Sequence, residues 1–192
     1  MKLILFDIDG TLLSTNQAAK RAFRRTLLSV YNETGPIDTH SFDGKTDPQI
    51  ARELLRLAGM PDASIEAGFA RFWPAYVASL EQELSEPHTR LTVYPGVPEL
   101  LERLFAAQND AVVGLLTGNV EAAATLKITA AGLANQFRVG AFGSDAEARN
   151  ELPAIAVARA RELTGSVLRK LSLRSPRELA GLWPELTPLA AP

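Results

Sequence analysis

Residues 3–11 of the chain read LILFDIDGT, and this stretch decides the fold. The unbroken apolar run at residues 3–6 is typical of a short strand that is buried on both faces inside a parallel sheet. Asp7 and Asp9 follow that run directly. Residues two apart in an extended chain point to the same side, so both carboxylates are expected to face one small volume.

Two carboxylates at the end of a buried strand cost free energy unless another group compensates their charge. A hard cation would do so, because Mg²⁺ is commonly held by one or two carboxylates together with a substrate phosphate. A simple turn is the alternative, since Asp-Gly is a frequent hairpin signal. A hairpin needs a second strand at once, whereas a helical pattern follows here, so the stretch favours a functional site.

The composition is that of an ordinary globular domain. The chain has 192 residues, is 46% hydrophobic, and carries a formal net charge of −2 from 20 basic and 22 acidic residues. This balance predicts neither a nucleic-acid surface nor a membrane surface. The absence of cysteine excludes disulfides, thiolate zinc sites and cysteine nucleophiles. The opening apolar run is too short for a signal peptide, so we expect a soluble, cytoplasmic monomer or weak dimer.

Helical patterns fill residues 15–90, and no strand pattern interrupts them. The expected helices run from a cap at Ser14 or Thr15 to about Tyr31, from Asp47 to Gly59, and from Asp62 to about Leu84. Asp47 is the expected N-cap of the second helix, because Pro48 suits the first helical position.

Strands and helices alternate after residue 90. The patterns predict strands at 111–116 and 139–142, and helices at 97–107, 120–131 and 153–163. Such alternation indicates a parallel α/β sheet with right-handed crossovers. The predicted organisation is therefore an α/β core of residues 1–14 and 91–165, with residues 15–90 inserted as a helical cap.

A second polar cluster follows the strand predicted at 111–116. Thr117, Gly118 and Asn119 stand at its carboxyl end, where open α/β sheets bind ligands. A hydroxyl, a glycine and backbone N–H groups at a helix start can cradle a phosphate. A plain helix cap explains these residues alone, but beside Asp7 and Asp9 a phosphate site is the better interpretation.

Two further side chains could reach the same ligand. Arg149 could stabilise phosphoryl oxygens, although its spacing alone favours an ordinary surface position. Lys45, in the segment GKTD at 44–47, either reaches an anionic substrate or simply belongs to a loop before a helix. His40 and His88 are expected on the surface, in polar loops.

These motifs together resemble those of the haloacid dehalogenase-like hydrolase superfamily. The likeness lies in Asp7-x-Asp9-Gly10-Thr11, in Thr117-Gly118-Asn119, and in Arg149 as a third motif. The segment DGKTD at 43–47 resembles the substrate loop of the inserted helical cap in phosphoglycolate phosphatase-like members. The resemblance covers about residues 1–165 and implies a Rossmann-like parallel sheet core with that cap.

The resemblance also implies a Mg²⁺-dependent phosphatase that acts on a small phosphorylated metabolite. Asp7 would be the nucleophile and form an aspartyl-phosphate, and Asp9 would protonate the leaving oxygen and then activate water. Both aspartates would bind Mg²⁺, and Thr117 and Arg149 would stabilise the transferred phosphoryl group. The substrate-binding residues implied are Gly10, Thr11, Lys45, Gly118 and Asn119.

The superfamily's fourth, acidic motif has no counterpart in the sequence. Residues 150–192 contain no aspartate, and Arg169 and Lys170 interrupt the segment SVLRKLSL (166–173) where its strand is expected. The first strand would then have an uncovered edge. Residues 166–192 are either an atypical, frameshifted tail or native sequence that leaves Mg²⁺ with fewer ligands; both predict weak Mg²⁺ binding and low activity. A phosphomutase of the same chemistry and a non-catalytic phospholigand- or partner-binding protein remain alternatives.

Overall fold

The computed structural model describes residues 1–106, 111–165 and 169–170. The strands are β1 (Lys2–Phe6), β2 (Leu13–Ser14), β3 (Thr92–Val93), β4 (Ala111–Leu116), β5 (Val139–Ala141) and β6 (Arg169–Lys170). The helices are α1 (Ala18–Tyr31), α2 (Asp47–Leu57), α3 (Asp62–Ser85), α4 (Val97–Ala106), α5 (Glu121–Ala130) and α6 (Leu152–Thr164). Two short 3₁₀ turns, η1 (Ala134–Gln136) and η2 (Arg149–Glu151), precede β5 and α6.

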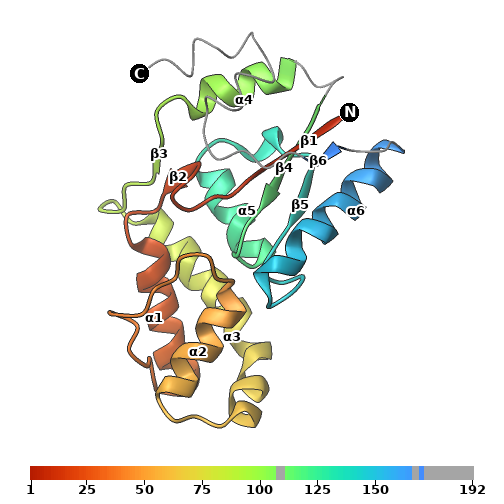
Figure 1. Cartoon of the computed structure of the whole chain (residues 1–192). Coiled ribbons are helices and arrows are strands. Elements are labelled where there is room, and N and C mark those ends of the chain that lie inside the picture. Colours follow the sequence, from red (N-terminus) through yellow and green to blue (C-terminus); the bar gives the residue numbers. More distant parts are fainter. Residues whose placement is uncertain (107–110, 166–168, 171–192) are drawn as a thin grey trace.

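A four-stranded parallel sheet in the order β5-β4-β1-β6 forms the core. Helices cover both of its faces (Figure 1). Ile4 of β1 packs with residues of α4 and α5, whereas Leu3, on the opposite face, packs with Ala160 of α6. β1 is thus covered on both sides, as its apolar run predicts, and the predicted Rossmann-like α/β fold is confirmed.

The edge of β1 differs from the expectation. β6 pairs with β1 through Lys2↔Arg169 and Leu3↔Lys170, so the inference that Arg169 and Lys170 interrupt the strand is wrong. Parallel pairing uses backbone N–H and C=O groups, which charged residues supply as well as apolar ones do. The rest of the expected atypical tail, residues 166–168 and 171–192, lies outside the described residues.

α1, α2 and α3 lie together beside the carboxyl end of the sheet (Figure 1). They share an apolar cluster in which Phe23 meets Phe72 and Tyr76 edge-on, with ring centroids 5.3 and 5.0 Å apart. Val120 and Ala123, in and just before α5, belong to the same cluster. α5 is therefore buried on two sides, against the sheet and against this helical block.

Two helix starts differ from the sequence prediction. α1 begins only at Ala18, because Asn16 and Gln17 adopt left-handed conformations with φ of 48° and 72°, and neither Ser14 nor Thr15 caps it. The N-cap of α2 is Thr46, whose side chain accepts a hydrogen bond from the backbone N–H of Gln49, and not Asp47. Asn16 donates to the backbone carbonyl of Arg90, and the Asp47 carboxylate accepts from the Val120 N–H. Local pattern does not reveal these contacts with distant parts of the chain.

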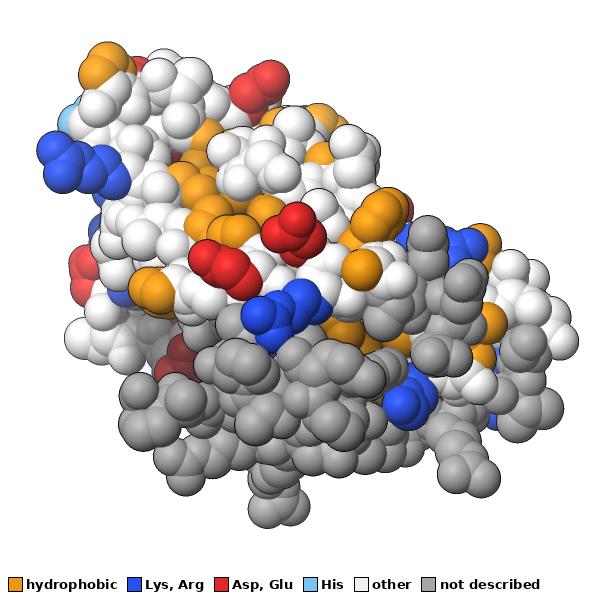
Figure 2. Space-filling view, turned by 90° about the horizontal axis from the view of Figure 1, so that it is seen from above, with side chains coloured by type: hydrophobic (Ala, Val, Ile, Leu, Met, Phe, Trp, Pro, Cys, Tyr) orange, Lys and Arg blue, Asp and Glu red, His pale blue; other side chains and the backbone are white. Residues whose placement is uncertain are grey.

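The surface adds little to the functional argument. In the part of the chain that is described, no helix combines the length and apolarity needed to cross a bilayer. On the face shown in Figure 2, the acidic and basic side chains that are coloured lie intermingled and do not gather by sign.

Candidate active site

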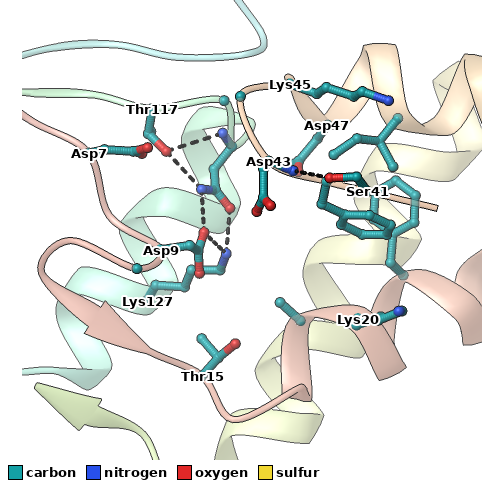
Figure 3. Close-up of a pocket in the computed structure, with 18 of the residues that line it drawn as sticks. Asp7, Asp9, Thr15, Lys20, Ser41, Asp43, Lys45, Asp47, Thr117 and Lys127 are labelled. Carbon is teal, nitrogen blue, oxygen red and sulfur yellow. Dashed lines mark hydrogen bonds and ion pairs between the residues drawn. The ribbon is translucent and has the colours of Figure 1, made fainter. Parts of the chain in front are cut away.

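A cavity of about 590 Å³ lies between the carboxyl end of the sheet and the helical block. The core side contributes residues from the loop after β1, the loop after β4, α5 and η2, and the helical block contributes residues of α1, the 40–47 loop, α2 and α3. Asp7 and Asp9 line this one cavity together with Thr117, as their positions after parallel strands predict. Figure 3 shows the side chains that meet there.

Asp7 is held from two sides. Its Oδ1 accepts a hydrogen bond from the backbone N–H of Ile8 at 2.8 Å, and its Oδ2 pairs with Nη2 of Arg149 at 2.6 Å. Arg149 stands 142 residues further along the chain, in η2, and its side chain is only 25% exposed. The surface position that spacing alone favoured for Arg149 is therefore wrong, because the fold brings it onto Asp7.

Asp9 is bound by a lysine that the sequence analysis did not single out. Its Oδ2 accepts hydrogen bonds from Nδ2 of Asn119 and from Nζ of Lys127, both at 2.7 Å. Lys127 also donates to Oδ1 of Asn119 at 2.5 Å, so the three side chains close a ring of contacts (Figure 3). The Lys127 side chain is 2% exposed, and a lysine so deeply buried is rarely found without a partner.

A signal for Lys127 existed in the sequence. The segment VEAAATLKITAAGL (120–133) is rich in alanine, and Lys127 stands at helical spacing from Ala123 and Ala124, on an apolar face of the predicted helix. A single lysine on such a face needs an acidic partner. Spacing alone could not identify that partner, because Asp9 is 118 residues away.

The loop after β4 joins the two sides of the cavity. Thr117 is fully buried, and its hydroxyl accepts a hydrogen bond from Nδ2 of Asn119 at 2.8 Å. Gly118 touches the 40–47 loop so closely that a Cβ added to it would lie 2.0 Å from the carbonyl oxygen of Lys45. The Gly118 carbonyl in turn accepts a hydrogen bond from the backbone N–H of Asp47 at 2.7 Å.

The Asp47 carboxylate belongs to the same junction. Its Oδ2 accepts a hydrogen bond from the backbone N–H of Val120 at 2.9 Å, just before α5, where a negative charge suits the helix dipole. Burial raises the pKa of Asp47 to about 6, and Lys127 and the Val120 N–H oppose that rise. Burial, with the charges of Asp47 and Asp9, also raises the pKa of the neighbouring Tyr76 well above its usual range.

Lys45 lines the cavity, but its ammonium is engaged elsewhere. Nζ of Lys45 pairs with Oε2 of Glu53 at 2.6 Å and contacts Nε2 of His40 at 3.1 Å. The His40 side chain is 11% exposed, so its expected surface position is wrong, whereas His88 is exposed as expected.

Of the remaining residues predicted to bind substrate, three line the cavity and one does not. Gly10, Gly118 and Asn119 line the cavity. Thr11 does not line it, and its backbone N–H donates to the carbonyl of Ile8 in the turn after β1.

The donors at the base of the cavity fit a magnesium ion. Asp7 can supply a carboxylate oxygen and Asp9 its backbone carbonyl from one loop, and Mg²⁺ is commonly held by one or two carboxylates plus substrate phosphate. Arg149 and Lys127 already neutralise one oxygen of each carboxylate. Within residues 1–106, 111–165 and 169–170, no group of three or more acidic or histidine side chains is placed to hold a metal ion.

Sequence comparison identifies the class to which this fold and site belong. The family model described as "Haloacid dehalogenase-like hydrolase" matches residues 4–159. The chain belongs to this family, and the resemblance seen in its motifs is confirmed. No curated protein matches the chain.

Solved structures share the fold at low sequence identity. CbbY from Rhodobacter sphaeroides in complex with phosphate has 18% identity and a TM-score of 0.59, and the match covers 83% of this chain and 72% of that one. A predicted phosphatase from Clostridium acetobutylicum has 14% identity and a TM-score of 0.58, covering 85% and 70%. A predicted phosphoglycolate phosphatase from Haemophilus somnus has 20% identity and a TM-score of 0.51. The match covers 76% of this chain but only 64% of the Haemophilus protein, less than two thirds of its length.

Proposed function

We propose that the protein is a Mg²⁺-dependent phosphatase that hydrolyses a small phosphate monoester through an aspartyl-phosphate. The observation that carries this proposal is the pair Asp7–Arg149 at the carboxyl end of β1, opening into a cavity of about 590 Å³. A nucleophilic carboxylate beside a guanidinium suits phosphoryl transfer, which depends mainly on positioning and charge neutralisation. The names of the phosphatase-like structures with the same fold agree with this function.

In the proposed reaction, Oδ of Asp7 attacks phosphorus and the bond from phosphorus to the leaving oxygen breaks. Arg149 and the Thr117 hydroxyl stabilise the charge on the phosphoryl oxygens. Asp9 gives its proton to the leaving oxygen. In the second step it takes a proton from the water that attacks phosphorus, the bond from phosphorus to Asp7 breaks, and inorganic phosphate leaves. Lys127 and Asn119 fix the position of the Asp9 carboxyl group during both steps.

Mg²⁺ bound at Asp7 and Asp9 would supply further positive charge for the phosphoryl group. No third acidic or histidine side chain among the described residues is grouped with these two to hold a metal ion, so we expect weak Mg²⁺ affinity and low turnover. Residues 15–90 would act as a cap that excludes water from the core formed by residues 1–14 and 91–165. The close contact of Gly118 with the 40–47 loop supports such closure.

The substitution Asp7→Asn tests the proposal. It keeps the size of the side chain but removes the nucleophile, so phosphate release from p-nitrophenyl phosphate with saturating Mg²⁺ should fall at least about 10³-fold. The purified variant Asp62→Asn, which changes an exposed acid paired with Arg56, serves as the matched control and should keep full activity. Persistent phosphate release by Asp7→Asn would refute the assignment.

Beryllofluoride separates the phosphatase from a non-catalytic protein on the same fold. With Mg²⁺ it mimics an aspartyl-phosphate, so the wild type should gain thermal stability and Asp7→Asn should not. A wild-type chain that binds phosphate esters but shows no beryllofluoride shift would favour the non-catalytic alternative.

A further inference from the structure

The two lysines on the cap side of the cavity, Lys20 and Lys45, contact other groups of the cap. Lys45 is bound to Glu53 at 2.6 Å. Lys20 lies 5.6 Å from the centre of the Phe42 ring, and its Nζ donates to the carbonyl of Asp38 at 3.4 Å. In Figure 3 both ammonium groups point away from Asp7 and Asp9.

One acidic side chain on the cap side, that of Asp43, points into the cavity, unlike the two lysines. The carboxylate of Asp43 is directed into the cavity, toward the side on which Asp9 lies (Figure 3). The backbone N–H of Asp43 donates to Oγ of Ser41 at 3.3 Å, but no donor among the described residues reaches its carboxylate. Asp47, further along the same loop, differs because the Val120 N–H occupies its Oδ2.

The orientations of the two lysines and of Asp43 determine which leaving groups the cavity can accept. A leaving group with its own negative charge would meet Asp43 without a cap-side cation to offset the repulsion, because Arg149 and Lys127 are paired with Asp7 and Asp9. Asp43 is exposed, and a leaving group with hydroxyl or ammonium donors would instead give its carboxylate a charge-assisted hydrogen bond in place of solvent. A site with a polar group for a substrate donor discriminates against analogues that lack that donor.

We propose that the cavity selects phosphate monoesters whose leaving group carries hydrogen-bond donors, and disfavours those with a second anionic group. Asp43 is the specificity-determining residue. Glu53 contributes because its ion pair with Lys45 keeps that ammonium from binding an anionic leaving group. The inference rests on the proposed function for the identity of the phosphate site, but it concerns the opposite wall of the cavity. It can therefore be tested by binding alone.

Calorimetric titration of the Asp7→Asn chain with three small esters provides that test. Glycerol 3-phosphate and 3-phosphoglycerate differ in one end, a hydroxymethyl group against a carboxylate. We expect glycerol 3-phosphate to bind about tenfold or more tightly than 3-phosphoglycerate. O-Phosphoethanolamine distinguishes the two kinds of donor: tighter binding than glycerol 3-phosphate indicates an ammonium site, and weaker binding a hydroxyl site.

Two further substitutions in the Asp7→Asn background separate the roles of the cap residues. Asp43→Asn should reduce the preference for glycerol 3-phosphate to about threefold or less. Glu53→Gln should release Lys45 and tighten 3-phosphoglycerate binding several-fold, while Asp62→Asn should leave all three affinities unchanged. Equal or tighter binding of 3-phosphoglycerate, an unchanged preference in Asp43→Asn, or no binding of any ester would overturn the inference.

The outcome is distinguishable from failure of the proposed function. If the binding preference is found but the wild-type chain releases no phosphate from any ester, the phosphatase assignment fails and the selectivity stands. If the wild type hydrolyses glycerol 3-phosphate and 3-phosphoglycerate with equal kcat/KM, and binding is also equal, the phosphatase stands and the selectivity fails.

Discussion

The two walls of the cavity differ in how their charged side chains are paired. The core wall consists of the lining residues from the loops after β1 and β4, from α5 and from η2, and the cap wall of those from residues 15–90. On the core wall, each acid is paired with a base from a distant element: Asp7 with Arg149 and Asp9 with Lys127. On the cap wall, the pairs are local, and Lys45 meets Glu53 only 8 residues away. The acids of the core wall are therefore positioned by contacts between distant elements, whereas the Lys45 ammonium on the cap wall is positioned by a pair within one loop and the helix that follows it.

The two walls are accordingly suited to different functions. Chemistry requires atoms held in one geometry, which a wall tied to the sheet, α5 and η2 provides. Selectivity requires groups that can change without disturbing the reaction, and a local loop allows this. Substitutions on the core wall should accordingly lower kcat, and substitutions on the cap wall should mainly change which ester is bound.

Lys127→Met tests the core wall and should have the largest effect. It keeps an unbranched side chain but removes the ammonium that positions Asp9, so kcat for an alkyl ester such as glycerol 3-phosphate should fall about 100-fold. Hydrolysis of p-nitrophenyl phosphate should fall much less, because its leaving group needs no proton. Steady-state assays on both esters give the two ratios.

The control for this prediction lies on the other wall. Lys20→Met removes a cap-wall ammonium and should leave kcat within about threefold on both esters. An equal loss on both esters in Lys127→Met would show that Lys127 supports only the structure of α5, and would contradict its role in positioning Asp9.

Gly118→Ala tests the junction between the walls. Its Cβ would lie 2.0 Å from the Lys45 carbonyl oxygen, a backbone atom that cannot move without displacing the 40–47 loop. A displacement of about 1 Å can cost up to about 100-fold, and we expect kcat/KM to fall about tenfold or more with faster proteolysis of that loop.

Gly132→Ala is the matched control for the junction. Gly132 has φ of +71° but no atom within 4 Å of an added Cβ, so alanine there should cost about 1 kcal/mol of stability and no activity. Normal activity in Gly118→Ala would show that the 40–47 loop does not need its close contact with the core.

The core of the fold could be predicted because its signals are local. The apolar run at 111–116 is the observed range of β4, the pattern over 153–163 corresponds to α6 within one residue, and the pattern over 97–107 corresponds to α4 as far as the described residues extend. Asp7, Asp9 and Thr117 were found in the same way, since residues at the carboxyl ends of parallel strands must meet.

The remaining features depend on contacts between distant residues. Lys127 was missed because only the folded chain brings it to Asp9. Thr46 caps α2 in place of Asp47 because the Asp47 carboxylate is already bound to Val120. The orientation of Lys45 depends in the same way on Glu53, so the motif identified the residue but not the direction of its side chain.

Asp47→Asn should have the smallest effect on activity and a measurable effect on stability. Asparagine can still accept the Val120 N–H, so kcat/KM should stay within about threefold. The folded pKa of Asp47, about 6, lies above its unfolded value of 3.8, so the ionised form destabilises the folded protein above pH 6. Two pKa units correspond to about 3 kcal/mol, an upper bound for the gain on substitution.

Urea unfolding of wild type and Asp47→Asn between pH 4 and 7.5 measures this gain. The wild-type folded state takes up a proton on Asp47 as the pH falls through about 6, so its disadvantage relative to the variant should shrink from pH 6 toward pH 4. A variant that is less stable than wild type at pH 7.5 would mean that the charge of Asp47 stabilises the junction. The cap wall would then be tied to the core by an ionic contact, and the contrast between a fixed wall and a local wall would have to be abandoned.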